Sequence, residues 1–203
     1  MEKNHSEEHN AELRLLTRES IFQALFLLME KQEFKKISIT DIVQRAGVSR
    51  MAYYRNFSSK EDILNTFLDS QFQRYTDSLD ADPDLSFYEL YQSFFAAFRG
   101  NSEWLKLLDK ANLTYLILER FTVYLHTILK DYFAPVEQST SDYELAFAAG
   151  GLYNLLMKWS RGGMRESDEE MAKLAIKIGW PQYSLSDTDP YSKISDWDPG
   201  EET

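Results

Sequence analysis

The stretch of residues 37–60, ISITDIVQRAGVSRMAYYRNFSSK, constrains the fold of this chain more than any other. Ser38 is followed three residues later by Asp41, so the serine can cap a helix while the carboxylate returns a hydrogen bond to the serine amide. Gly47 stands where a chain that leaves a helix needs a positive φ, which glycine adopts without a Cβ clash. Ser49 can cap a second helix directly afterwards. A helix, a short glycine turn and a second helix predict a helix-turn-helix, whose second helix enters the major groove of DNA.

The second of these helices, expected over residues 50–56, carries side chains suited to DNA. Arg50 and Arg55 can each donate two hydrogen bonds to guanine or phosphate, and Tyr54 offers a hydroxyl to phosphate. Tyr53 is expected to face the interior. A capped pair of helices with scattered arginines also occurs on ordinary protein surfaces. Here the turn, both caps and a basic outward face coincide, which favours DNA binding.

The charge of the chain is divided between two regions of opposite sign. Residues 13–60 hold nine Lys or Arg against four acids, a net charge of +5. Because the whole chain carries −11, the remaining residues carry −16. A basic module on an acidic body attracts phosphates locally while the rest of the protein repels non-specific DNA.

The same residues resemble a known family, the TetR-type (tetracycline-repressor-like) regulators of transcription. The DNA-binding part of that family ends in a pattern close to G-V-S-x-x-x-x-Y-x-x-F-x-x-K-E-x-L. The matching residues here are Gly47-Val48-Ser49, Tyr54, Phe57, Lys60-Glu61 and Ile63-Leu64. The match continues upstream through residues 39–46 and covers roughly the first third of the chain. The chain departs from the pattern at Tyr53, where leucine is usual, and at Met51, where a small residue is common.

The resemblance implies which residues contact DNA. Thr40 and Lys60 are expected on phosphates, and Lys60 opens a helix whose free amides favour an anion. The full set of expected DNA contacts is Thr40, Ser49, Arg50, Met51, Tyr54, Arg55, Asn56 and Lys60. The resemblance also implies a homodimer that binds a palindromic operator in double-stranded DNA.

The helix-capping and helix-breaking residues along the chain predict an all-α fold. Serine caps, glycines and prolines separate segments of helical apolar spacing, and no segment alternates convincingly as a strand. Besides the helix-turn-helix, helices are predicted over residues 13–31, 60–79, 87–98, 102–110, 114–132, 142–160 and 168–179. The expected organisation is a flexible N-terminal tail (1–12), a helix-turn-helix DNA-binding domain (13–62), a helical effector-binding and dimerisation domain (63–180) and an acidic C-terminal tail (181–203).

The second domain is unusually aromatic, and the family resemblance implies that such side chains line a mostly apolar effector cavity. The residues expected to line it are Tyr91, Phe94, Phe95, Phe98, Trp104, Tyr115, Thr122, His126 and Phe147. Aromatic residues at helical spacing are more often simply part of the core. Both interpretations stay open.

The last two helices are expected to form the dimer interface, because small residues along one of them permit close helix approach. The expected interface residues are Ala146, Gly150, Asn154, Met157, Leu174 and Ile178. The stretch of residues 158–164, KWSRGGM, also resembles the C-terminal region of one TetR subgroup that includes dihydroxyacetone-responsive activators.

These features predict a ligand-responsive repressor that binds its operator as a homodimer. The alternative is an activator, or a regulator switched by a protein partner instead of a small molecule. An enzyme is not expected, since no glycine-rich loop follows a strand and no catalytic triad pattern is present. We expect no cofactor and no metal, and the absence of cysteine removes disulfides and thiolate chemistry. No apolar run approaches the ~18 residues of a membrane span, so a cytoplasmic protein is expected.

Overall fold

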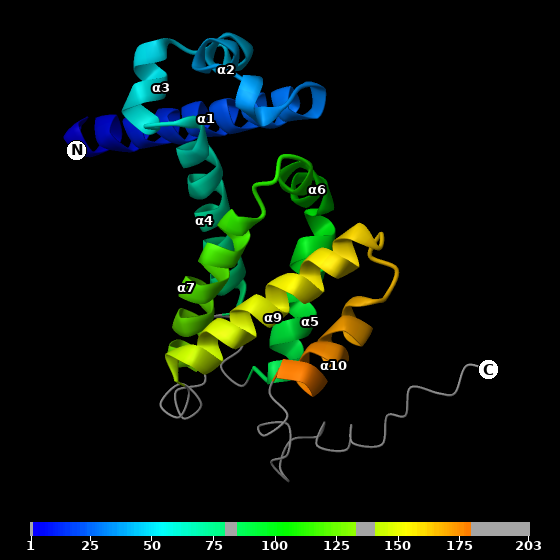
Figure 1. Ribbon diagram of the computed structural model, residues 1–203. Coiled ribbons are helices and arrows are strands. Elements are labelled where there is room, and N and C mark those ends of the chain that lie inside the picture. The colour runs from blue at the N-terminus through cyan, green and yellow to red at the C-terminus, as the bar shows by residue number, and fades with distance from the viewer. Residues whose placement is uncertain (1, 80–84, 133–140, 180–203) are drawn as a thin grey trace. The chain divides into compact units, whose positions relative to one another are not determined.

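The computed structural model describes residues 2–79, 85–132 and 141–179, and these residues form helices joined by short turns, without strands (Figure 1). Side chains are described from residue 12 onward. The predicted acidic tail lies outside the described residues. The helices are α1 (Glu2–Lys31), the short 3-10 helix η1 (Phe34–Lys36), α2 (Ile39–Ala46), α3 (Arg50–Asn56), α4 (Lys60–Leu79), α5 (Phe87–Gly100), α6 (Ser102–Lys110), α7 (Tyr115–Tyr132), α9 (Asp142–Arg161) and α10 (Asp168–Gly179). The predicted all-α fold is confirmed.

Serine caps begin several of these helices, as the spacing of serine and acidic residues predicts. At the start of α5, the Glu89 amide donates to the Ser86 hydroxyl at 3.2 Å, and the Ser86 amide donates to the Glu89 carboxylate at 2.9 Å. The Ser86 hydroxyl and amide together hold the pKa of Glu89 below its usual range. The same reciprocal pairs open α2, α5 and α9: Ser38 with Asp41, Ser86 with Glu89, and Ser141 with Glu144. Each pair satisfies amides that a helix start leaves without partners.

The first helix is longer than predicted. It begins at Glu2, so the stretch of residues 1–12 that was expected to be a flexible tail is helical from its second residue. Neither glycine nor proline interrupts the chain before Lys31, and strong helix formers dominate it. Among its side chains from residue 12 onward, the first that is buried is Ile21, which is fully buried, whereas Leu16 is 55% exposed although its spacing places it on the apolar side.

The described chain divides into two compact units whose boundary differs from the predicted one at residue 62. The first unit comprises Met1–Gln73 and Glu103–Leu116, and the second comprises Arg74–Ser102 and Ile117–Thr203. Helix α6 thus groups with α1 and α4 in the first unit, whereas α5 and most of α7 belong to the second. The physical reason is an aromatic cluster: the ring of Phe67 on α4 stacks on Phe22 of α1 at 3.9 Å and meets Trp104 of α6 edge-on at 5.5 Å.

In the first unit, α2 and α3 both pack on α1 (Figure 1). Their shared core consists of apolar side chains that are almost completely buried. These are Ile21, Leu25, Ile42, Tyr53, Phe57, Ile63 and Leu64. Burying such side chains contributes about 1.5–3 kcal/mol each relative to exposure, so this core holds the short helices α2 and α3, which would not persist alone.

In the second unit, α5 is the central helix and packs most extensively on α10. The ring of Phe94 contacts Phe121 of α7 at 5.3 Å, and the ring of Phe95 contacts Trp159 of α9 at 5.4 Å. Buried aromatic side chains of α5 therefore meet two other helices, α7 and α9.

The turn between α9 and α10 is held by one arginine of α5. The Arg99 guanidinium donates to Asp168 Oδ1 at 2.8 Å, to the Met164 carbonyl at 2.9 Å and to the Glu166 carbonyl at 2.6 Å. It also lies 4.7 Å from the centre of the Trp159 ring. Met164 adopts a positive φ of 53° although it is not glycine, and this backbone conformation costs energy on its own. The bonds from Arg99 offset that cost.

Candidate nucleic-acid interface

The turn between α2 and α3 has the geometry that the sequence predicts. Gly47 adopts the left-handed conformation, with φ 67° and ψ 27°. A Cβ at Gly47 would meet no atom within 4 Å, so glycine is needed there for its backbone conformation and not for space. Ser49 then caps α3 by accepting a hydrogen bond from the Ala52 amide at 3.0 Å. Together these features fix the direction in which α3 leaves the turn.

The helical period of α3 places some of its side chains in the core and the others in solvent. Tyr53 is fully buried, as the spacing predicts. Met51 and Tyr54 are 65% and 59% exposed, and the two arginines beside them are also exposed. We call the exposed set Arg50, Met51, Tyr54 and Arg55 the α3 face. It combines two permanent positive charges with an apolar thioether and an aromatic ring.

Hydrogen bonds hold both arginines of the α3 face in place. Arg50 Nη2 donates to the hydroxyl of Thr40 on α2, which links the first turns of the two helices. Arg55 Nη2 lies 3.4 Å from the Met51 sulfur, one turn back along α3. Positioning of this kind lowers the side-chain entropy lost when the guanidinium groups bind a ligand.

Lys60, which is expected to contact phosphate, is bonded inside the protein in this structure. Its ammonium donates to the carbonyl oxygens of Phe34 at 2.7 Å, Ile37 at 3.0 Å and Lys35 at 3.4 Å. It also lies 4.5 Å from the centre of the Phe34 ring. Since an ammonium has three protons, these carbonyls use its donor capacity, and Lys60 ties the start of α4 to η1.

Asn56 is likewise turned toward its own helix. Its Nδ2 donates to the Ala52 carbonyl at 2.8 Å, and its Oδ1 is buried without a hydrogen-bond partner among the described residues. The expected base or phosphate contact from Asn56 therefore has no support in this geometry.

Tyr53 is a second buried polar group on α3. Its hydroxyl is buried without a hydrogen-bond partner among the described residues. Burial raises the pKa of this phenol to about 12, with smaller effects from Tyr54 and from the acidic residues at the start of α4. The family pattern has leucine at this position. The tyrosine of this chain therefore places a polar atom at an apolar core position.

The nine residues expected to line an effector pocket do not surround one cavity. Trp104 and Tyr115 belong to the first unit, whereas the other seven belong to the second. Phe94, Phe95 and Phe98 contact one another and the rings around them, so they fill the core. Four of the nine are exposed: Tyr115, Thr122, His126 and Phe147. For the buried members, the core interpretation fits the structure better.

The residues expected at a dimer interface fall into two groups. Met157 is only 2% exposed and belongs to the core of its own second unit, because its position on α9 faces inward. Ala146, Asn154 and Ile178 are exposed, while Gly150 and Leu174 are half-buried.

The exposed α9 residues among those expected at the dimer interface lie on one side of that helix, together with two exposed aromatic residues. Tyr143 and Phe147 are 89% and 72% exposed and lie one turn apart on the same side of the helix as Ala146 and Asn154. We call these four residues the α9 face. Sequence reasoning assigned Phe147 to the pocket and missed Tyr143, although their four-residue spacing was visible.

Among the residues whose structure is described, no group of three or more His, Cys, Asp or Glu side chains is arranged to hold a metal ion. Within the same residues, no helix combines the length and apolarity needed to cross a membrane.

Comparison with known proteins places this geometry in context. The family model described as "Bacterial regulatory proteins, tetR family" matches residues 21–66. The HTH-type transcriptional regulator AlkX of Mycobacterium tuberculosis is 27% identical over 87 residues, which cover 43% of this chain and 41% of that protein. The HTH-type transcriptional regulator EthR of Mycolicibacterium smegmatis is 33% identical over 78 residues, 35% of this chain and 36% of that protein. The chain thus matches about two fifths of the length of these relatives.

Solved structures share the fold over most of the chain. The "Dihydroxyacetone kinase operon activator DhaS" has a TM-score of 0.60 at 15% identity, covering 84% of this chain and 98% of that one. A TetR transcriptional regulator from Streptococcus agalactiae 2603V has a TM-score of 0.61 at 18% identity, covering 84% of this chain and 97% of that one. At these identities the likeness concerns the fold alone.

Proposed function

The chain belongs to the TetR family of bacterial regulatory proteins, and from this premise we propose that it binds a palindromic operator as a homodimer and represses transcription until a small molecule releases it. The observation that carries this proposal is the α3 face, a preorganised cationic and amphipathic surface on the second helix of a helix-turn-helix. The alternative of activation uses the same interface and differs only in the effect on transcription.

Each side chain of the α3 face has a task that suits its chemistry. Arg50 and Arg55 donate bidentately to guanine or to phosphates. Met51 presents an apolar surface to thymine methyl groups, and Tyr54 donates its hydroxyl to a phosphate. Thr40 and Ser49 flank this face at the first turns of α2 and α3, where free amides favour phosphate. Lys60 and Asn56 are not included, since their donors are used inside the protein.

The α9 face supports the proposed homodimer. Two exposed aromatic rings one turn apart form an apolar surface larger than a scattered single side chain. In a two-fold dimer the same surface meets its own copy. Two α3 helices would then enter major grooves about 34 Å apart or a multiple of that distance, which is the reason to expect a palindromic operator.

Ligand response requires two arrangements of the protein with different affinity for the ligand. Helix α4 is shared by both compact units, with its first part in the unit that contains α3 and its end in the other. In this proposal a change in one unit reaches the other along the chain of α4.

Operator selection from a random or genomic DNA pool, followed by fluorescence anisotropy with the selected duplex, tests DNA binding. Replacing Tyr54 and Arg55 together by alanine should weaken binding at least ~1,000-fold, since two base or phosphate contacts at ~1–3 kcal/mol each are removed from each of the two subunits. The melting temperature should change little, because both side chains are exposed. A double variant that binds as tightly as the wild type would place the interface elsewhere.

Sedimentation velocity tests the dimer. Phe147→Glu should shift the protein to monomers, because it places a charge in the centre of the α9 face. Val123→Glu is the matched control, since Val123 is 61% exposed on α7 of the same unit but lies outside the α9 face. Equal dissociation of both variants, or of neither, would argue against this interface.

A further inference from the structure

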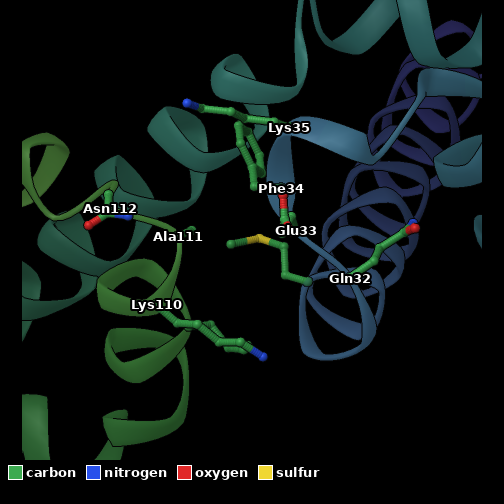
Figure 2. A pocket seen from close by; sticks show the side chains of 9 residues that line it. Gln32, Glu33, Phe34, Lys35, Lys110, Ala111 and Asn112 are labelled. Atoms are coloured by element: carbon green, nitrogen blue, oxygen red, sulfur yellow. The ribbon is translucent and has the colours of Figure 1, made fainter.

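A pocket of about 220 Å³ lies inside the first unit, where the end of α1, the η1 turn and the end of α6 meet. Figure 2 shows Phe34 on one side of the opening and Lys110 on the opposite side, with Asn112 and Gln32 at the two remaining edges. All lining residues belong to the unit that contains α3. The pocket exists because α6 packs with this unit, which the sequence does not predict.

The walls of the pocket are apolar. Met29 and Phe34 are buried at 3% and 7% exposure, and Leu107 of α6 also lines the pocket. A volume below the ~300–1,000 Å³ of pockets for drug-sized ligands limits an occupant to on the order of ten non-hydrogen atoms. The walls therefore suit a short hydrocarbon chain or a single ring.

The rim of the pocket carries unbalanced positive charge. The Glu33 carboxylate is paired with Lys36 at 2.9 Å, whereas Lys35 and Lys110 have no carboxylate partner among the described residues. Asn112 adds an amide, and its positive φ of 58° is a conformation that asparagine tolerates better than most residues. An apolar interior with a cationic rim fits a molecule that has an apolar tail and one anionic head.

Phe34 connects the pocket to both neighbours of α3. Its ring lines the pocket and also faces the Lys60 ammonium at 4.5 Å, and its carbonyl accepts from that ammonium at 2.7 Å. Lys60 is the first residue of α4, directly after the helix-turn-helix. On the other side, η1 leads through Ile37 to Ser38, the cap of α2. An occupant that moves Phe34 therefore acts on the starts of α2 and α4.

We propose that this pocket binds a small monocarboxylate with an apolar tail of about six to eight carbons, and that such binding changes the affinity of the protein for its operator. The second part rests on the proposed function, whereas binding itself does not. The carboxylate pairs with Lys110 at the rim, and the tail lies against Phe34 and Leu107.

Calorimetric titration of the full-length protein with octanoate tests binding without DNA. Lys110→Gln should weaken octanoate binding about tenfold, the usual effect of one charge-assisted hydrogen bond. Lys106→Gln, on the same helix, should change the affinity less than twofold, because Lys106 pairs with Glu103 at 2.9 Å and does not line the pocket. Ala111→Trp should fill the pocket and abolish binding, with its fold checked by circular dichroism. Octylamine should not compete, since its head group is cationic.

Several outcomes would overturn the proposal. No binding of octanoate up to 10 mM (about 2.7 kcal/mol), equal binding by octylamine, or unchanged binding in Ala111→Trp would each exclude the pocket as this site. Binding that Lys106→Gln weakens as much as Lys110→Gln would reduce it to non-specific charge attraction.

A second experiment, performed on the complex with the operator, distinguishes failure of this inference from failure of the proposed function. Octanoate is titrated into the complex with the selected duplex, using wild type and Ala111→Trp. A change in operator affinity in the wild type alone supports regulation through the pocket. Specific octanoate binding with no change in operator affinity refutes the regulatory part, whereas a protein that selects no duplex refutes the proposed function and leaves the calorimetric result standing.

Discussion

Replacing Lys60 by methionine should destabilise the protein while leaving its phosphate contacts unchanged. Methionine keeps most of the apolar stem but removes the ammonium that bonds the carbonyls of Phe34 and Ile37 at 2.7 and 3.0 Å. For a partly exposed charged donor we take about 1 kcal/mol for each short bond and about 0.5–1 kcal/mol for the contact with the Phe34 ring. The third, longer bond is neglected, which gives an expected loss of about 2–3 kcal/mol.

Thermal unfolding and salt titration together decide between the two roles of Lys60. A loss of this size lowers the melting temperature of a protein of this length by about 5–10 °C. The slope of log Kobs for the operator against log salt should stay as in the wild type, because no phosphate contact is lost. Lys36→Met is the matched control: it removes a positive charge from η1, the turn that Lys60 contacts, but only an exposed ion pair with Glu33 worth about 0–1 kcal/mol.

The opposite pattern would refute this reasoning. If Lys60→Met melted like the wild type and its salt slope fell by about 0.9 for each subunit, Lys60 would be the phosphate contact that the family resemblance implies. The bonds to η1 would then be incidental to stability.

Four further predictions concern other parts of the chain. Replacing thymine by uracil in the half-sites should weaken wild-type binding about fourfold for each methyl group that Met51 covers, whereas Met51→Ala should not distinguish the two bases in anisotropy titrations. Tyr53→Phe should leave stability unchanged or raise it by about 1 kcal/mol, because it removes a buried hydroxyl without a partner; a clear fall in melting temperature would reveal a hidden bond. Glu89 has a folded pKa below its unfolded value, so its contribution to stability is present above the unfolded pKa and is lost as pH falls from about 5 through the folded pKa; in acid titrations Ser86→Ala should reduce that part of the pH dependence, because it removes the hydroxyl and keeps the backbone amide. Arg99→Met should lower stability by about 2–3 kcal/mol in denaturant unfolding, since an ion pair and two carbonyl bonds are lost together.

The helix-turn-helix could be predicted from the sequence because its determinants are local. The bond between Ser38 and Asp41, the left-handed conformation of Gly47 and the cap at Ser49 each depend on residues within four positions of one another. Local backbone preferences and caps act on the same short segment, so they agree without help from the rest of the chain. The burial of Tyr53 follows from the same helical period.

The hydrogen bonds that Lys60 and Asn56 make within the protein could not be predicted in this way. The type and position of these two residues match a DNA-contacting pattern. The direction in which each side chain points depends on the groups that it contacts in the folded structure. Lys60 meets carbonyls 23 to 26 positions earlier in the chain, and no periodicity in the sequence reports such a contact. The same holds for the aromatic residues of α5, whose spacing is compatible with a pocket or a core until the neighbouring rings are placed.

By itself, the sequence determined the helices, their caps and the basic surface of the recognition helix, because each arises from interactions between near neighbours along the chain. Only the tertiary structure decided that α6 joins the DNA-binding unit, that Met157 turns inward while Tyr143 and Phe147 turn outward, and that a pocket opens beside Phe34. These outcomes depend on packing between segments distant in sequence, where the best fit of whole surfaces, and not the preference of any single residue, sets the arrangement.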